Sequence, residues 1–133
     1  MRPETLTGYG FQSFAEPFTK DFKNGLCLVN GVNQFDEAAD SNGAGKTTLF
    51  EAVCWCMYGV TSKGVTGDKV ISWSKKQCMV QLTIQSGDDY YAIRRTRKHH
   101  TLKNSLKFEK NGVDLTRGSM KETQKVILSL IHI

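Results

Sequence analysis

A glycine-rich segment, set between an apolar run and a helical pattern, restricts the possible folds of this chain more than any other feature. Residues 42–48 read NGAGKTT. The run at residues 26–29 before them is wholly apolar, as in a strand that is buried on both faces. After them, apolar side chains recur at helical spacing over residues 46–58, and Gly59 follows as a C-cap. A strand, a glycine-rich loop and a helix in this order predict a phosphate-binding loop of the P-loop type.

The chemistry of this loop fits the triphosphate of a nucleotide. Glycines let backbone N–H groups converge on a phosphate without Cβ atoms in the way, and the helix N-terminus adds unpaired donors and a partial positive charge. Lys46 supplies a full positive charge to the β- and γ-phosphates, Thr47 offers a hydroxyl oxygen of the kind that Mg²⁺ prefers, and the Thr48 N–H can serve the α-phosphate. We therefore predict that the chain binds ATP with Mg²⁺, with Thr47 as the metal ligand. The predicted binding residues are Ser41, Asn42, Gly43, Ala44, Gly45, Lys46, Thr47 and Thr48.

The loop departs from the strict pattern Gly-x-x-x-x-Gly-Lys-Ser/Thr at its first position, which is Asp40 here. The nearest earlier glycine is Gly31. We interpret Gly31 as the glycine that ends the strand, and residues 32–40 as an insertion within the loop. Because Asp40 would repel phosphates, we expect its side chain to point away from them. The alternative is a glycine-rich turn that only caps a helix.

The rest of the chain predicts an antiparallel meander followed by a helix. Alternating apolar and polar side chains indicate half-buried strands, and glycine-containing turns separate them. Asn111-Gly112 is a hairpin signal. Ser119 followed by Glu122 is a capping-box pattern, so a helix is expected from Met120. The expected strands cover residues 5–11, 18–22, 78–85 and 90–97, with a further strand around Leu106 and Phe108.

Composition narrows the class of protein. The chain has 133 residues, of which 39% are hydrophobic and 23% are charged, as expected of one globular domain. It contains no run of about 18 apolar residues that could span a membrane, and its start lacks the apolar region of a signal peptide. We therefore expect a cytoplasmic protein with no membrane partner. The net charge of +5 permits contact with nucleic acid without requiring it.

The four cysteines, Cys27, Cys54, Cys56 and Cys78, form no CxxC pair and have no histidine at zinc-site spacing. We expect them to be reduced, structural and buried, since free cysteine is among the most buried residue types. Cys54 and Cys56 lie two positions apart on the predicted helix, so their side chains are expected to point to different sides of it.

Some other side chains are weaker candidates for function. The basic run that begins at Arg94 and ends at His100 could contact DNA phosphates, or it could be a strand end followed by a solvated turn. His99 and His100 have no cysteine or carboxylate partner at metal-ligand spacing, which argues against a metal site. Trp55 and Trp73 are expected in the core or at an interface rather than stacked on a nucleotide.

Residues 42–53 resemble the Walker A segment of the SMC-like ATPases. Within this group they look most like the DNA-end-processing branch, which includes the SbcC subunit of the bacterial SbcCD nuclease and the ATPase subunits of phage recombination endonucleases. Residues 10–14 resemble the first strand of the family and its following turn, residues 55–59 the end of its first helix, and residues 90–95 its meander strand. The resemblance covers residues 6–127, and the combined pattern is much more specific than Walker A alone.

The resemblance implies a fold: the N-terminal lobe of an ABC-type ATPase head, which is an incomplete α/β P-loop NTPase with a mixed sheet, an antiparallel meander and a P-loop helix. In the family, a long antiparallel coiled coil follows this lobe, and a C-terminal lobe then supplies the signature motif, Walker B and the catalytic glutamate. The sequence shows neither that signature nor an apolar run ending in Asp-Glu after the meander. We therefore assign no catalytic residue, and expect the chain alone to bind ATP weakly and to hydrolyse it hardly at all.

For the whole protein, the resemblance implies that two heads sandwich two ATP molecules. Hydrolysis would then gate the access of a partner nuclease of the SbcD type to DNA ends, in the cytoplasm of a bacterial or phage-infected cell. Residues 31–33 and the insertion before residue 41 look particularly like the phage members. Gln12 is a departure, because relatives often have a basic residue there, near the nucleotide; Gln12 and Ser13 are only weak candidates for lining the site.

Two other functions remain open. One is a transport-type ABC ATPase, although the segment after the first predicted helix shows no transporter-like layout. The other is a nucleotide-dependent, DNA-binding recombination mediator that has no nuclease partner.

The ATPase lobe is expected to cover residues 1–127. Residues 128–133 are similar to the translation of a transposon end that is used to make sequencing libraries, and we interpret them as a sequencing artefact or the start of a truncated region. An ordinary apolar turn of helix is the alternative.

Overall fold

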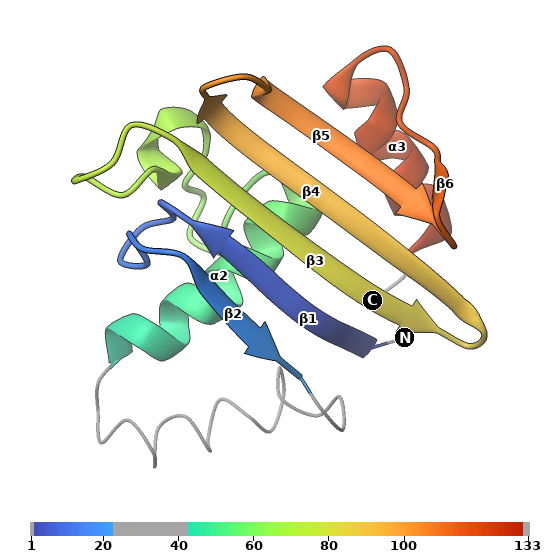
Figure 1. Ribbon diagram of the computed structural model, residues 1–133, viewed down its shortest axis with the longest axis horizontal. Coiled ribbons are helices and arrows are strands. Elements are labelled where there is room, and N and C mark those ends of the chain that lie inside the picture. Colours follow the sequence, from blue (N-terminus) through green and yellow to red (C-terminus); the bar gives the residue numbers. More distant parts are fainter. Residues whose placement is uncertain (1, 23–42, 132–133) are drawn as a thin grey trace.

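One antiparallel sheet, with helices on a single face, forms the framework of the chain. The computed structural model describes residues 2–22 and 43–131, with side chains throughout these ranges except at residues 43–47. The described strands form a six-stranded sheet in the order β2-β1-β3-β4-β5-β6, in which every pairing is antiparallel (Figure 1). The strands are β1 (Arg2–Tyr9), β2 (Phe18–Asp21), β3 (Cys78–Ser86), β4 (Asp89–His99), β5 (Lys103–Lys110) and β6 (Val113–Asp114).

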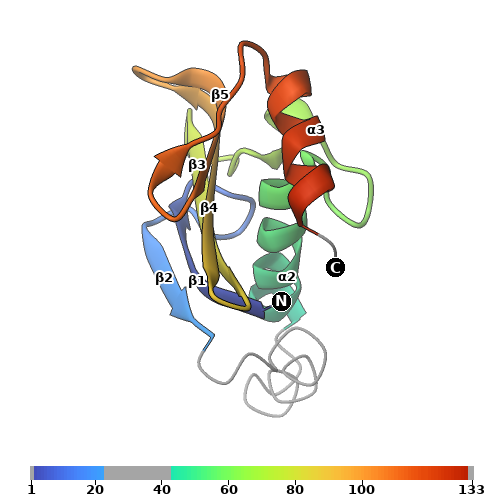
Figure 2. The same ribbon diagram turned by 90° about the vertical axis from the view of Figure 1, so that its right-hand side faces the viewer.

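Helices α2 (Gly43–Tyr58) and α3 (Met120–Leu130) lie side by side on one face of this sheet (Figure 2). A short 3-10 helix, η2 (Gly67–Val70), follows α2 in the chain. The predicted apolar strand at residues 26–29 and the insertion at residues 32–40 lie outside the described residues. No helix in the described ranges is long and apolar enough to cross a lipid bilayer.

The core lies between the sheet and the two helices. Leu6, Leu82, Ile93 and Phe108 face one another in register across β1, β3, β4 and β5, and all four side chains are fully buried. This row forms because side chains alternate between the two faces of each strand, so that one apolar set points toward the helices. α2 covers the row with its buried residues Ala52, Val53, Trp55 and Cys56.

Local sequence signals predicted several elements correctly. β3 shows the predicted period of two, with every second side chain buried. Asn111 and Gly112 both have positive φ and join Lys110 to Val113, which confirms the predicted hairpin. The hydroxyl of Ser119 accepts a hydrogen bond from the Glu122 N–H at 3.2 Å, so α3 begins at Met120 as the capping box predicts.

β1 differs from its predicted range of residues 5–11. It begins at Arg2 and ends at Tyr9, because Gly10 has a φ of +69° and turns the chain out of the strand. Phe11 then makes only isolated bridges, to Phe14 and to Ile71. Residues 10–14 therefore form a tight turn, closed by backbone hydrogen bonds between Phe11 and Phe14, rather than the last part of a strand.

The described cysteines are free thiols, as predicted, and Cys27 lies outside the described residues. Cys56 and Cys78 are buried, whereas Cys54 is half-buried, so neighbours on α2 do point to different sides. Burial raises the pKa of both Cys56 and Cys78 to about 12. These two thiols stay protonated at neutral pH, which makes them poor nucleophiles and poor metal ligands.

Candidate functional site

The predicted phosphate loop leads directly into α2. α2 begins at Gly43, three residues earlier than the predicted start at Lys46, so the segment with its two glycines already belongs to the helix. Glycine costs about 1 kcal/mol in a helix relative to alanine, but packing of α2 against the sheet outweighs this cost. Ser41 and Asn42, like Gly31 and Asp40, lie outside the described residues.

The electrostatics of this helix end suit an anion. The first N–H groups of a helix have no partner within it, and its N-terminus carries a partial positive charge. The first turn of α2 contains Lys46 and no acidic residue that could compete with a phosphate. Unpaired backbone donors and the sequence position of Lys46 thus coincide at the N-terminus of α2, which follows the glycine-rich loop.

Thr48, the last residue of the predicted loop, is where side-chain detail begins. It is buried, with 5% of its surface exposed, and its hydroxyl oxygen lies 2.8 Å from that of Ser13. Ser13 belongs to the tight turn after β1, which Gln12 fastens by donating its N–H to the Val70 carbonyl at 2.8 Å. The structure therefore brings Ser13, only a weak candidate from the sequence, into direct contact with the predicted phosphate loop.

This contact can be tested by a double-mutant cycle. Thr48→Val and Ser13→Ala should each lower the free energy of unfolding by about 1 kcal/mol, because each substitution removes the hydrogen bond between the two hydroxyls. The double variant should lose less than the sum, with a coupling of at least about 0.5 kcal/mol in urea denaturation. Strictly additive losses would mean that the two hydroxyls do not interact.

Arg95, a member of the basic run, is buried and contacts the C-terminal end of α2. Arg95 is 5% exposed, and its Nε donates to the Cys56 carbonyl at 3.2 Å. Its Nη2 donates to Gln124 Oε1, and Gln124 Nε2 donates to the Met57 carbonyl at 2.7 Å. A cation at a helix C-terminus is favourable, and burial lowers the pKa of Arg95. Arg95 and Gln124 thus fasten the last turn of α2 to α3.

The sequence contained a signal for this role of Arg95. Tyr91 and Ile93 were predicted to share one face of their strand, and the same period of two places Arg95 next on that inner face. Arg97 donates instead to Asp68 at 2.7 Å, and Lys98 pairs with the same carboxylate at 3.0 Å. The basic run is therefore not one continuous surface for DNA, because its members divide between the core, an ion-pair cluster and a turn.

The two histidines of the run belong to the turn between β4 and β5. His99 Nδ1 accepts hydrogen bonds from the N–H groups of Thr101 and Leu102 at 3.2 and 3.1 Å. Partial burial lowers the pKa of His99, and the neighbouring His100 adds to the effect. Within residues 2–22 and 43–131, no group of three potential ligand side chains gathers in a way that could hold a metal ion.

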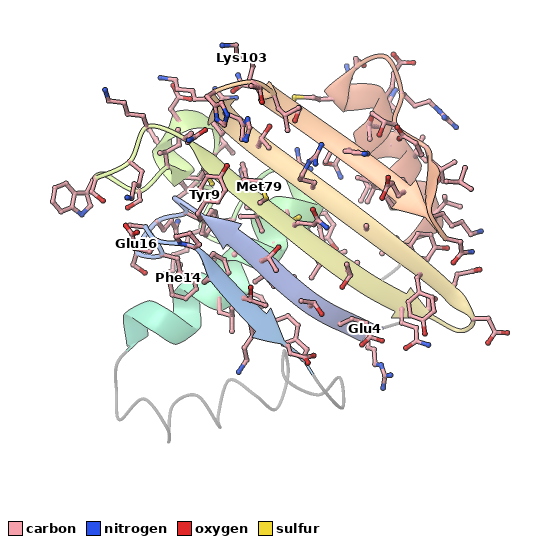
Figure 3. The ribbon with its side chains drawn as sticks, viewed as in Figure 1. Glu4, Tyr9, Phe14, Glu16, Met79 and Lys103 are labelled. Carbon is pink, nitrogen blue, oxygen red and sulfur yellow. The ribbon has the colours of Figure 1, made fainter. Side chains whose placement is uncertain are left out.

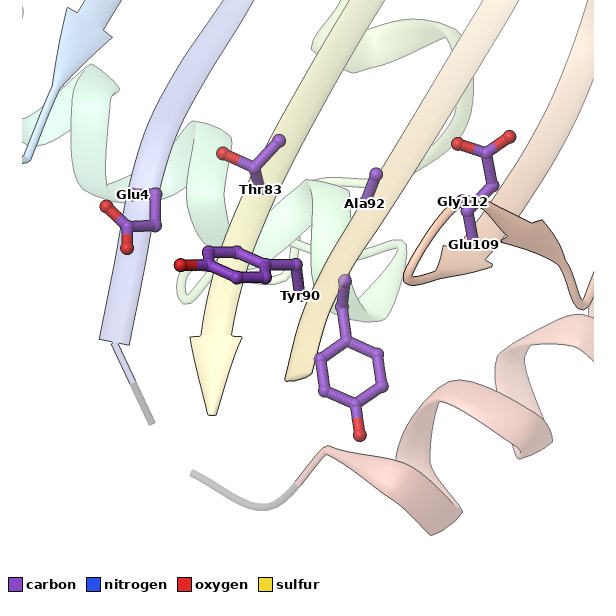
Figure 4. Close-up of a pocket in the computed structure, with 7 residues that line it drawn as sticks. Glu4, Thr83, Tyr90, Ala92, Glu109 and Gly112 are labelled. Atoms are coloured by element: carbon purple, nitrogen blue, oxygen red, sulfur yellow. The ribbon is translucent and has the colours of Figure 1, made fainter. Parts of the chain in front are cut away.

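The exposed face of the sheet carries a shallow depression of about 480 Å³ near the β3–β4 turn. Its charged lining residues, Glu4 and Glu109, are both acidic (Figure 4). They would repel a phosphate, and the depression contains none of the predicted binding residues. This depression is therefore unsuited to a nucleotide. The other labelled lining residues are Thr83, Tyr90, Ala92 and Gly112.

Comparison with known proteins places this arrangement in a family. A model of the AAA domain family matches residues 5–132. The chain is also similar to the SbcC protein of the SbcCD nuclease from Deinococcus radiodurans, with 30% identity over 138 residues. That match covers 98% of this chain and 14% of the relative, so the chain spans about one-seventh of the length of the curated protein it matches.

Solved structures share the fold. The recombination mediator protein RecF-ATP aligns with a TM-score of 0.63 at 16% identity, over 98% of this chain and 31% of that chain. A structure described under ATP-driven dimerization and DNA-stimulated activation of SMC ATPases aligns with a TM-score of 0.57 at 18% identity, over 97% of this chain and 76% of that chain. At these identities the likeness concerns the fold alone, and it confirms the predicted ABC-type head lobe.

Proposed function

Because the chain belongs to the AAA domain family and is an SMC-like ABC ATPase lobe of the SbcC type, we propose that it is the ATP-binding lobe of an ATPase that processes DNA ends in repair and recombination. The observation that carries the ATP part is the sequence at residues 43–48, which opens α2 with Lys46 in a first turn free of acidic residues. Such a helix start binds phosphates through backbone donors and a lysine.

The oxygen chemistry of the loop also fits Mg²⁺. Magnesium prefers hard oxygen ligands and commonly binds together with nucleotide phosphates. Thr47 provides such an oxygen directly after Lys46, and we assign it to the metal. When bound, Mg²⁺ would neutralise part of the charge of the phosphates. The protein's own contribution is to bind and orient them at the N-terminus of α2.

We extend the proposal to the whole protein with the help of its relatives. The name of the D. radiodurans relative identifies it as part of a nuclease, which supports a partner nuclease of the SbcD type and DNA ends as the substrate. The description of the SMC structure as undergoing ATP-driven dimerization supports a second ATPase head as a partner. ATP binding would then join two heads, and hydrolysis in the complete protein would gate the nuclease.

The role of Thr47 predicts a change in the magnesium requirement. In Thr47→Ala, roughly tenfold more Mg²⁺ should be needed to promote ATP binding, because a loss of this size is typical of disturbed metal coordination. ATP affinity is measured by isothermal titration calorimetry across a Mg²⁺ series. Thr19→Ala, the same substitution at an exposed position of β2, is the matched control and should behave as wild type. An unaltered magnesium requirement in Thr47→Ala would remove Thr47 from the site.

The DNA-processing part is tested by the coding sequence that follows the codon for Ile127 in the parent DNA. We expect heptads of a coiled coil, then a signature motif and Walker B. A different globular domain in that place would leave the ATP site standing and would withdraw the assignment to DNA-end processing, in favour of a mediator without a nuclease.

A further inference from the structure

The connection between η2 and β3 presents a tryptophan to solvent. Both tryptophans were predicted to lie in the core or at an interface. Trp55 is 2% exposed and lies in the core, whereas Trp73 is 97% exposed, which excludes the core for Trp73. A large apolar side chain so fully exposed is unfavourable unless something covers it. Figure 1 shows this connection projecting beyond the start of β3.

The fold holds both ends of this connection. At its start, the buried Ser72 donates its N–H to the Gly10 carbonyl at 2.7 Å, and the Lys75 N–H closes a turn onto Ser72 at 2.9 Å. At its end, Gln77 Oε1 accepts from the His100 N–H at 2.9 Å, which ties the connection to the β4–β5 turn. Trp73 therefore lies on a turn that hydrogen bonds hold at both ends, close to the basic C-terminal end of β4.

Three lysines line the same depression as this tryptophan. Trp73, Lys75, Lys76 and Lys98 line one open depression of about 530 Å³, together with Ile71, Ser72 and Asp68. A second depression of about 330 Å³ shares Lys75 and Lys76 and continues toward Tyr9, Ala15 and Pro17. Figure 3 shows Tyr9 and Glu16 at the end of the sheet where β1 ends and β3 begins. We refer to Trp73, Lys75, Lys76 and Lys98 as the tryptophan corner.

The charge of the corner favours an anionic ligand. Asp68 is shared by Arg97 and Lys98, at 2.7 and 3.0 Å, and Glu16 pairs with Lys75 at 2.7 Å. The corner and its ion pairs thus contain four cations (Lys75, Lys76, Arg97 and Lys98) and two carboxylates (Glu16 and Asp68), which leaves a charge of +2. The sharing of one carboxylate by two cations leaves positive charge beside the ring.

We propose that the tryptophan corner binds single-stranded DNA, with one base stacked on Trp73 and neighbouring phosphates on Lys75, Lys76 and Lys98. Binding sites for single strands combine a positive track with aromatic rings, because every base offers a flat face to stack on. In a duplex these faces are occupied by neighbouring bases. A protein partner fits less well, since lysine is depleted in protein interfaces and the corner offers little apolar surface beside the ring.

The choice of DNA as the nucleic acid rests on the proposed function, but the binding itself needs no nucleotide. It is measured on the 133-residue chain without ATP, by fluorescence anisotropy of a labelled short oligodeoxythymidylate. Trp73→Ala should weaken binding by roughly 5- to 150-fold, the range for the loss of one base–aromatic stack, and Trp73→Phe should restore most of it. Lys76→Gln should reduce the slope of log affinity against log salt by about 0.7.

Tyr90→Ala is the matched control, because Tyr90 is an exposed aromatic residue at the opposite end of β4 and should not affect binding. Wild-type affinity in Trp73→Ala, no binding of the oligonucleotide, or equally tight and Trp73-dependent binding of a duplex would each overturn the proposal. Lys46→Ala separates the two proposals, since it should abolish ATP binding and leave oligonucleotide binding unchanged. If the wild-type protein binds ATP but not the oligonucleotide, only the proposal for the tryptophan corner is wrong. If it binds the oligonucleotide but not ATP, only the proposed ATP site is wrong.

Discussion

Replacing Gly10 with alanine is expected to lower the free energy of unfolding by about 2–5 kcal/mol. Gly10 has a φ of +69°, where a residue with a Cβ atom costs roughly 1–2 kcal/mol. In addition, a Cβ atom there would lie 2.0 Å from the backbone oxygen of Gln77, so the backbone itself must move. Such overpacking typically costs about 1–3 kcal/mol, and the two costs together are a large share of the stability of a single domain.

Gly87→Ala separates these two causes. Gly87 has a similar φ of +63°, but a Cβ atom there would meet no atom within 4 Å. It should therefore cost only the roughly 1–2 kcal/mol of the backbone conformation. Urea denaturation of both variants gives the comparison. If Gly10→Ala cost no more than Gly87→Ala, the close approach of the turn after β1 to the start of β3 would be disproved.

The Gly10 variant also has a functional consequence. The Gly10 carbonyl accepts from Ser72, and the turn that follows Gly10 carries Ser13 to Thr48. A shift of this turn would therefore disturb two contacts: that of Ser13 with Thr48 of the predicted phosphate loop, and that of Gly10 with Ser72 next to Trp73. Reduced ATP affinity is expected in Gly10→Ala even under conditions in which the variant remains folded.

The sequence predicted the elements whose signals are local. The alternation in β3, the turn at Asn111-Gly112 and the cap at Ser119 each depend on residues a few positions apart, and the structure confirms all three. The Walker A pattern of residues 42–48 is equally local, and it led to the family that the comparisons confirm.

Features that depend on residues far apart in the sequence were not predicted. β1 pairs with β3 seventy or more positions later, and this pairing brings Gly10 against Gln77. The local period of two in β4 turns Arg95 inward, but its two acceptors, the Cys56 carbonyl of α2 and the Gln124 side chain of α3, lie far from it in the sequence. Trp73 was predicted to lie in the core or at an interface, and the connection to β3 leaves its ring in solvent, which excludes the core. A hydrophobicity pattern has no information about which segments meet.

The second large effect is expected at Lys46. Its ammonium group provides the one full positive charge in the first turn of α2, and charge-assisted contacts to phosphate are the strong ones. Removing one partner of such a pair costs about 2–5 kcal/mol, or roughly 30-fold to several thousand-fold in affinity. Lys46→Ala should therefore bind ATP too weakly to be detected at concentrations that saturate the wild type. Lys121→Ala, at an exposed position of α3, is the matched control.

Calorimetric titration of Mg²⁺–ATP into wild type, Lys46→Ala and Lys121→Ala tests the central claim most directly, with circular dichroism to show that all three are folded. The account predicts measurable binding for wild type and Lys121→Ala, and none for Lys46→Ala. If Lys46→Ala binds ATP as tightly as wild type, residues 42–48 are not the phosphate-binding loop, and the glycine-rich segment is only the turn that begins α2.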